Sequence, residues 1–237
     1  MKTMKSKFYS LALAAGMLTL TACSDDNTND SNNDKGNGIE NGSTLKGTIT
    51  EDVTLKAGNT YKLSGEYIVE AGATLNIEEG VKIISVYDNI VDYILVKQGA
   101  KINAVGTPDK PIVMTSEKEE PGAWGGIHIC GKAHTNAEGG KGSSEIGGAV
   151  YGGNDDADNS GTLQYIRLEY TGFAFDEEHE ANGISFYGVG SGTIVDHCEA
   201  YKGSDDGFEF FGGSVNVSNM VVVSCSDDSF DLSLIHI

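Results

Sequence analysis

The sequence contains little proline, cysteine, tryptophan or positive charge. Of its 237 residues, 3 are proline, 4 are cysteine and 1 is tryptophan, and 35 acidic side chains outnumber 16 basic ones, for a formal net charge of −19. Cysteines so few and so unevenly spaced argue against a disulfide framework and give no zinc pattern. The shortage of Lys and Arg argues against nucleic acid and anionic lipid headgroups as partners, because no basic patch is available to neutralise phosphates.

A hydrophobic run long enough to cross a membrane is also missing. The apolar stretch 11–20 follows three lysines and is too short to span a bilayer as a helix, which predicts a signal peptide over residues 1–22. The stretch closes on Leu20-Thr21-Ala22-Cys23, which resembles the lipobox of bacterial lipoproteins. The resemblance implies cleavage before Cys23 and lipidation there, so that the lipid anchor alone holds the protein at a membrane. An ordinary signal peptide with a coincident cysteine is the alternative.

Residues 23–43 form a run of Asn, Asp, Ser and Gly with almost nothing to bury, which predicts a disordered tether. Its acidic start, Ser24-Asp25-Asp26, resembles the surface-export signal of some Gram-negative groups. We therefore expect a lipid-anchored protein of the outer membrane, exposed at the cell surface.

The end of the sequence is unusual. Residues 232–237 match the translation of a transposon end used as a sequencing adapter. We therefore expect the native sequence to stop near Asp231 and the domain to be truncated. A genuine short terminal strand is the alternative.

What the sequence does contain is glycine, 32 in all, between short segments rich in Val, Ile, Thr and Tyr. This pattern is typical of strands and turns, and it predicts an all-β protein. Ser204-Asp205-Asp206-Gly207-Phe208 returns as Ser226-Asp227-Asp228-Ser229-Phe230, and 182–188 returns as 206–212 at a slightly longer offset. Looser repeats match 66–77 with 92–103 and 160–163 with 191–194.

Repeats of this length predict a right-handed parallel β-helix over residues 44–231, with coils of about 22–24 residues. A propeller blade needs a longer repeat, and the consensus of leucine-rich repeats is absent. The register predicts that Ile184, Phe208 and Phe230 stack inside the helix, as do Val195 and Val217. The polar segments 131–161 and 173–181 are expected to leave the helix as loops.

Several motifs after residue 66 resemble a family of bacterial surface lipoproteins whose fold is a right-handed parallel β-helix of the pectin-lyase-like superfamily. The resemblance implies the fold and the location; it supplies no activity and no catalytic base. The motifs that carry it are Gly99–Ile102, Gly106–Pro108, Pro111–Ser116, Gly122–Ile127, Asp158–Leu163, Tyr187–Thr193 and Asp205–Gly213.

The repeated aspartate pair is the first candidate site. Adjacent rungs of a sheet lie about 4.8 Å apart, so stacked carboxylates repel one another. A bridging Ca²⁺ held by Asp205, Asp206, Asp227 and Asp228 explains the repetition. The alternative is that each aspartate caps its coil turn by accepting from local backbone amides.

An exposed acid beside an aromatic ring is the second candidate site. If Phe208 and Phe210 point inward, then Glu209 and Phe211 face solvent and offer a carboxylate and a ring to a sugar. Trp124 is a further candidate for stacking on a ligand. For both aromatic residues the alternative is packing beneath a loop or over a turn.

These features favour a surface lipoprotein that binds an extracellular glycan or a surface protein, without catalysis in the part seen here. No nucleophile elbow, phosphate loop or dinucleotide fingerprint is present, and no catalytic residue can be assigned. The first alternative is a Ca²⁺-dependent polysaccharide lyase or hydrolase whose catalytic residues lie in further coils. The second is a structural or adhesive surface repeat.

Overall fold

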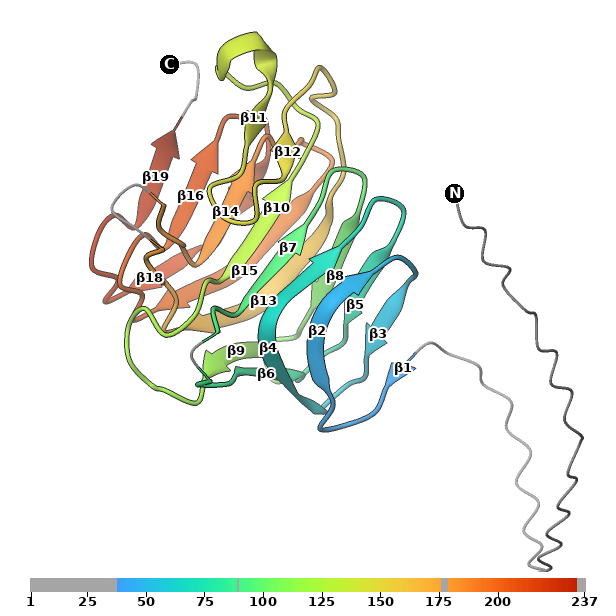
Figure 1. Cartoon of the computed structure of the whole chain (residues 1–237), viewed down its shortest axis with the longest axis vertical. Helices are drawn as coiled ribbons and strands as arrows, with labels where there is room; N and C mark the ends of the chain where they lie inside the picture. The colour runs from blue at the N-terminus through green and yellow to red at the C-terminus, as the bar shows by residue number, and fades with distance from the viewer. Residues whose placement is uncertain (1–37, 89, 176–178, 234–237) are drawn as a thin grey trace, which may run out of the picture. The chain divides into compact units, whose positions relative to one another are not determined.

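Three ladders of parallel strands surround one apolar interior in the computed structural model, which describes residues 38–88, 90–175 and 179–233 (Figure 1). The chain contributes one rung to each ladder per coil, and a single 17-stranded sheet results. Connections between parallel strands of a sheet are right-handed, so the fold is the predicted right-handed parallel β-helix. In the described residues, no helix is long and hydrophobic enough to cross a membrane.

The first ladder carries the candidate site, and its later strands lie side by side in Figure 1. It consists of the second halves of β2 (Thr44–Ile49) and β4 (Thr60–Val69), then β7 (Tyr93–Val96), β10 (Ile127–Cys130), β14 (Ile184–Tyr187), β16 (Phe208–Phe211) and β19 (Phe230–Ser233).

The other two ladders close the coil. The second consists of β1 (Gly38–Ile39), β3 (Val53–Leu55), β5 (Thr74–Ile77), β8 (Lys101–Val105), the first halves of β13 (Gly161–Glu169) and β15 (Ile194–Tyr201), and β17 (Asn216–Ser218). The third consists of the first halves of β2 and β4, then β6 (Lys82–Ser85), β9 (Ile112–Ser116), the second halves of β13 and β15, and β18 (Val221–Val223).

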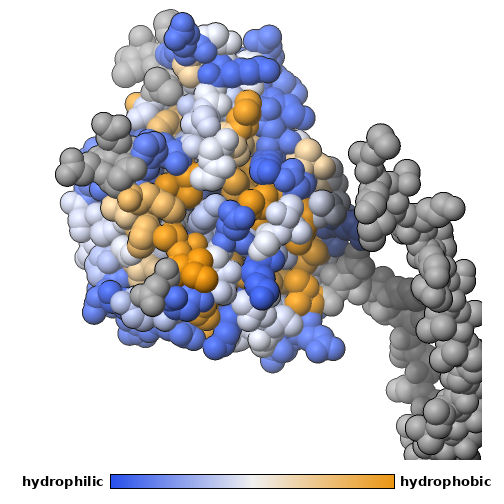
Figure 2. All heavy atoms as spheres, viewed as in Figure 1, coloured by the Kyte–Doolittle hydropathy of each residue, from blue (hydrophilic) through white to orange (hydrophobic). Residues whose placement is uncertain are grey.

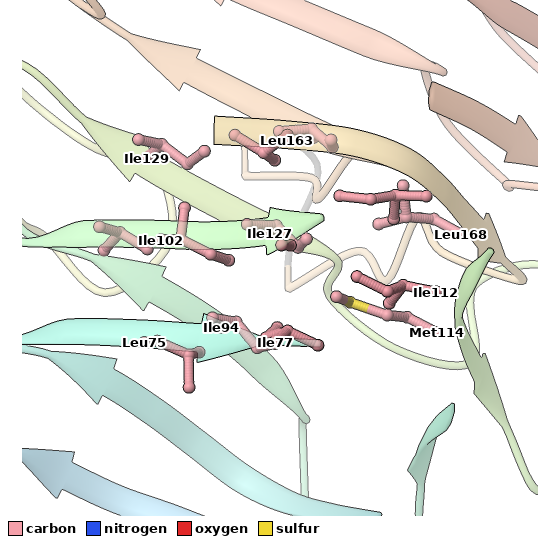
Figure 3. Packing of buried hydrophobic residues seen from close by; sticks show 14 of the residues in the cluster. Leu75, Ile77, Ile94, Ile102, Ile112, Met114, Ile127, Ile129, Leu163 and Leu168 are labelled. Atoms are coloured by element: carbon pink, nitrogen blue, oxygen red, sulfur yellow. The ribbon is translucent and has the colours of Figure 1, made fainter. Parts of the chain in front are cut away.

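Alternation along the strands sends every second side chain inward. In β4, buried and more exposed residues alternate over the whole strand. The inward residues of all three ladders meet in one core, and Leu75, Ile102, Leu163, Ile127 and Met114 belong to the same buried cluster (Figure 3). The predicted stacks are confirmed, since Ile184 pairs with Phe208, Phe208 with Phe230 and Val195 with Val217. Phe230, on the last described rung, is nevertheless 45% exposed and lies outside the buried core.

The predicted coil length holds for only part of the chain. Val53 pairs with Leu75, and Phe208 pairs with Phe230. In both cases the paired residues are 22 positions apart in the sequence, as predicted. Ile127, in contrast, lies over Ile184, at the far end of a much longer coil. The difference comes from the segment between β10 and β13, which leaves the helix as predicted. It carries the 3-10 helix η1 (Glu138–Gly140) and an antiparallel hairpin of β11 (Gly142–Ser143) and β12 (Val150–Tyr151).

Two of the looser repeats were aligned one residue out of register. Tyr67 pairs with Ile94, not Tyr93, and Thr162 pairs with Ile194, not Thr193. A slip of one residue exchanges the inward and outward faces of a strand. These two alignments therefore place the wrong side chains in the core.

The described β structure extends beyond the predicted bounds of 44–231. At one end β1 pairs with β3, and at the other Leu232 and Ser233 pair with Phe210 and Phe211. The predicted signal peptide (1–22), the lipidated Cys23, the tether up to residue 37 and residues 234–237 lie outside the described residues.

Candidate functional site

Two columns of side chains project outward from the first ladder. The register places His128, Ser185, Glu209 and Asp231 in one column on successive rungs. The second column contains Cys130, Tyr187, Phe211 and Ser233. The outward direction predicted for Glu209 and Phe211 is confirmed, because their neighbours Phe208 and Phe210 belong to the core.

The exposure predicted for Glu209 and Phe211 is wrong. Glu209 is 8% exposed and Phe211 is 7% exposed. Phe211 stacks on Tyr187 with ring centroids 4.4 Å apart, and both belong to a second apolar cluster with Ile146 and Tyr151 of the long excursion. The excursion therefore covers the outer face of the first ladder. Figure 2 shows hydrophobic residues gathered in the middle of the viewed face, inside a hydrophilic border.

Trp124 is also buried and does not offer a ring to a ligand. Its side chain is 1% exposed and packs in the main core. The indole Nε1–H donates to the carbonyl oxygen of Glu169 at 2.7 Å, which satisfies its one polar atom. This is the structural alternative that the sequence left open.

The buried cysteines are not reactive groups. Cys130, Cys198 and Cys225 are free thiols, and burial raises the pKa of Cys130 and of Cys198 to about 12. A thiol with such a pKa is protonated at neutral pH and is a poor nucleophile. Cys130 and Cys198 are therefore small buried hydrophobes of the core and of the second apolar cluster.

The aspartate pairs lie in the connections that lead into β16 and β19. The backbone N–H of Asp228 donates to Asp206 Oδ1 at 2.8 Å, and the N–H of Gly207 donates to the carbonyl oxygen of Asp228 at 3.0 Å. Asp206 therefore caps a turn, as one interpretation predicted, but it caps the turn of the next coil and not its own.

Carboxylates from the two coils meet in two overlapping groups. Asp205, Asp206 and Asp227 form the first, and Asp206, Glu209 and Asp231 form the second. In each group one oxygen from every residue lies within 4.8 Å of the others. We call the five residues the acidic cluster. It includes three of the four predicted metal ligands; Asp228 belongs to neither group.

The sequence interpretation missed Asp231 as a member of the cluster and assigned Glu209 to a different role. The signal that identifies both is the register, because Glu209 and Asp231 occupy equivalent outward positions on successive coils. The sequence interpretation treated Asp231 only as the last native residue.

Burial raises the pKa of several acids in and beside the cluster. It raises the pKa of Glu209 to about 8, with a further contribution from the nearby charge of Glu145, and it raises the pKa of Asp205 to about 7, with Asp206 next in importance. The pKa of Asp206 rises to about 6, and that of Glu145 to about 7, both chiefly through burial. The cluster therefore retains protons at neutral pH unless a cation replaces them.

A buried amide next to the cluster has an unused acceptor. Asn182 is 1% exposed, and its Nδ2 donates to Glu209 Oε2 at 2.6 Å and to Ser185 Oγ at 3.1 Å. Its Oδ1 has no hydrogen-bond partner among the described residues. An unsatisfied buried acceptor is costly, and an oxygen in this position suits a cation or an ordered water.

Comparison with known proteins supports the fold. The profile of a pectate-lyase like beta helix domain matches residues 47–233, which is most of the chain. The search of curated proteins and the search of solved structures gave no match. The matched range includes every strand from β3 to β19 and the whole acidic cluster, so the chain belongs to the family of pectate-lyase-like β-helix domains.

Proposed function

We propose that this β-helix is a cell-surface module that binds extracellular glycan through a divalent cation held in the acidic cluster. The observation that carries the proposal is the meeting of five carboxyl groups from two successive coils on the outer side of β16 and β19. Attachment by a lipid at Cys23 and a position at the outer membrane rest on the N-terminal sequence alone.

The donor set of the cluster fits Ca²⁺. Calcium takes six to eight oxygen ligands in flexible geometry, and carboxylates and amide carbonyls are among its usual ligands. The cluster supplies carboxylates from Asp205, Asp206, Glu209, Asp227 and Asp231. Asn182 donates to Glu209 through Nδ2, and its Oδ1 has no hydrogen-bond partner among the described residues. A bound cation would replace the protons that now relieve the repulsion among these groups.

A cation also explains how so acidic a protein would hold a polar or acidic polysaccharide. With a net charge of −19, the protein repels uronate chains unless a cation intervenes. Calcium leaves coordination positions for sugar hydroxyl or carboxylate oxygens after binding a few protein ligands.

Calcium is expected to raise the melting temperature at neutral pH, and a chelator is expected to lower it again. Asp205→Asn combined with Asp227→Asn, or Glu209→Gln alone, should remove the shift, because each removes ligands without changing side-chain volume much. Asp109→Asn, an exposed acid outside the cluster, is the matched control and should keep the full shift. Identical melting curves of the wild type with calcium and with chelator would refute the cation site.

Binding to glycans is tested separately. Immobilised acidic and neutral polysaccharides should retain the calcium-loaded protein, and chelation should release it from the acidic ones. If calcium stabilises the protein but no glycan retains it, the cation has a structural role and the adhesive or structural alternative is favoured.

Catalysis is a second candidate, favoured by the pairing of Glu209 with Asp231. Burial raises the pKa of Glu209 to about 8, so at neutral pH it is a protonated acid beside the carboxyl group of Asp231. Many glycoside hydrolases use two carboxyl groups, one of which is kept protonated by a raised pKa. The test is release of reducing ends or of unsaturated products from polyuronates and neutral polysaccharides, which Glu209→Gln should abolish. If none of these polysaccharides yields a product, the catalytic function is excluded.

A further inference from the structure

A groove lies on a different side of the helix from the acidic cluster, at the bend between the second and third ladders. It has a volume of about 340 Å³, within the range of small-molecule sites. Its wall includes Thr107 and Pro108 from one turn, and Tyr165, Arg167, His197 and Asn219 from the bends of three successive coils.

The bend stacks three side chains along the helix axis. Tyr165, His197 and Asn219 each adopt a positive φ, 51°, 52° and 52°, and they occupy the same position in consecutive coils. A positive φ is uncommon for non-glycine residues and unfavourable for an aromatic one. The rings of Tyr165 and His197 stack with centroids 4.5 Å apart and planes inclined by 22°. The coil thus holds two rings side by side at a position that does not favour them.

Polar groups fix this wall in place. The carboxylate of Asp196 accepts from Asn219 Nδ2 at 2.7 Å and lies 2.9 Å from His197 Nδ1. These contacts orient the second and third members of the column before any ligand arrives. Binding to a wall that is already ordered costs less conformational entropy.

The cationic group in the groove is already neutralised. Arg167 donates to both carboxylate oxygens of Glu199 at 3.0 and 2.9 Å and to Glu169 at 2.6 Å, and its guanidinium lies 4.2 Å from the centre of the Tyr201 ring. One positive charge beside two negative charges gives no attraction for an anionic ligand. The charges therefore disfavour an anionic ligand, and the fixed polar groups suit a ligand that exchanges hydrogen bonds with them.

We propose that this groove is a second binding site, for a neutral saccharide, that needs no metal ion. Ordered rings supply an apolar wall, the carboxylate of Glu199 and the amide of Asn219 supply fixed polar contacts, and the volume fits one or two sugar rings. Thr107 also lines a second, open cavity of about 690 Å³ beside β5 and β8, which gives a longer oligosaccharide a path along the helix. The choice of a saccharide rests on the glycan-binding function proposed above; the position of the groove does not.

The test uses the whole chain in the presence of a chelator, so that the acidic cluster cannot contribute through a cation. Hexasaccharides of glucose, xylose and mannose are the probes, and calorimetry or NMR titration measures affinity. We expect at least one of them to bind, and Tyr165→Asn to weaken it at least about tenfold through loss of the ring. Asparagine is chosen because Asn219 already occupies this column and because it tolerates a positive φ.

Two further variants keep the outcome decisive. Tyr87→Asn removes a tyrosine that is 61% exposed and lies outside the groove, and it should bind like the wild type. His197→Asn replaces Tyr165→Asn if the latter lowers the melting temperature. The proposal is overturned if no neutral hexasaccharide binds in chelator, or if folded Tyr165→Asn and His197→Asn bind as the wild type does. Binding of neutral sugars that requires calcium or is lost in Glu209→Gln would assign them to the acidic cluster and also overturn it.

Discussion

Calcium-free protein is expected to lose stability steadily as the pH rises from about 4 to about 8. The cause is the set of buried acids, led by Glu209, whose pKa is raised from 4.5 to about 8 by burial. Asp205 and Asp206 shift in the same direction, from 3.8 to about 7 and to about 6. Below the pKa of the unfolded state both states are protonated, and above it the unfolded chain releases protons that the folded protein retains. These acids therefore stabilise the fold most at low pH, and their contribution falls until the folded groups also ionise. Buried His128, whose pKa is lowered to about 4 by burial, acts in the opposite direction up to about pH 6.5 and offsets only part of this loss.

The acid with the largest pKa shift, Glu209, sets the size of the effect. One pKa unit corresponds to about 1.4 kcal/mol, so Glu209 alone contributes a loss on the order of several kcal/mol. That is a large share of the roughly 5–15 kcal/mol that stabilises a typical domain. Denaturant unfolding or melting, followed across this pH range with chelator present, measures it.

Glu209→Gln is the informative control for the pH effect. Glutamine has nearly the same shape and no charge, so the variant should be more stable than the wild type near the alkaline end of the range and less dependent on pH. A wild-type stability that is flat or rises between acid and neutral pH would contradict the argument. Added calcium should flatten the wild-type curve, because the cation replaces the retained protons.

Gly126→Ala is expected to destabilise the fold by more than about 4 kcal/mol or to prevent folding. A Cβ at this position would lie 2.1 Å from the carbonyl oxygen of Asn182 and 2.6 Å from that of Gly183, both on the next coil. The backbone atoms of these strands cannot move aside without breaking the hydrogen bonds to the strands of the neighbouring coils. The shift would also displace Asn182, which donates to Glu209, so any folded variant should lose its response to calcium.

Gly139→Ala separates steric collision from backbone strain. Gly139 has φ +73°, close to the +67° of Gly126, but no atom of the described residues lies within 4 Å of its added Cβ. Its cost should be limited to the roughly 1–2 kcal/mol of placing an alanine in the left-handed region. Chemical denaturation of both variants gives the difference, and equal costs would show that close packing of the coils is not what requires Gly126.

The fold was largely predictable because a β-helix repeats its own local pattern. The similarity of 204–208 to 226–230 and of 182–188 to 206–212 places Ile184, Phe208 and Phe230 in one column, and the structure confirms it. The matches of 66–77 with 92–103 and of 160–163 with 191–194 are looser. Short alternating strands look alike when shifted, so the sequence alone could not exclude an error of one residue.

The site was only partly predictable. The repeat offset placed Asp205 with Asp227, and the alternation gave the outward direction of Glu209. The burial of Glu209 and Phe211 was not predictable, since it depends on where the excursion between β10 and β13 folds back. Trp124 likewise lies among glycines in the sequence, and nothing local indicates that Glu169 accepts its indole hydrogen.

By itself, the sequence determined the class of fold, a parallel β-helix, because the alternation along each strand and the closest repeats involve residues that are neighbours in the chain or one coil apart. Only the tertiary structure decided the chemistry of the site. The pKa of an acid depends on which distant side chains exclude water from it and which charges lie within a few ångströms. Those contacts come from a long excursion of irregular sequence, whose path no period specifies.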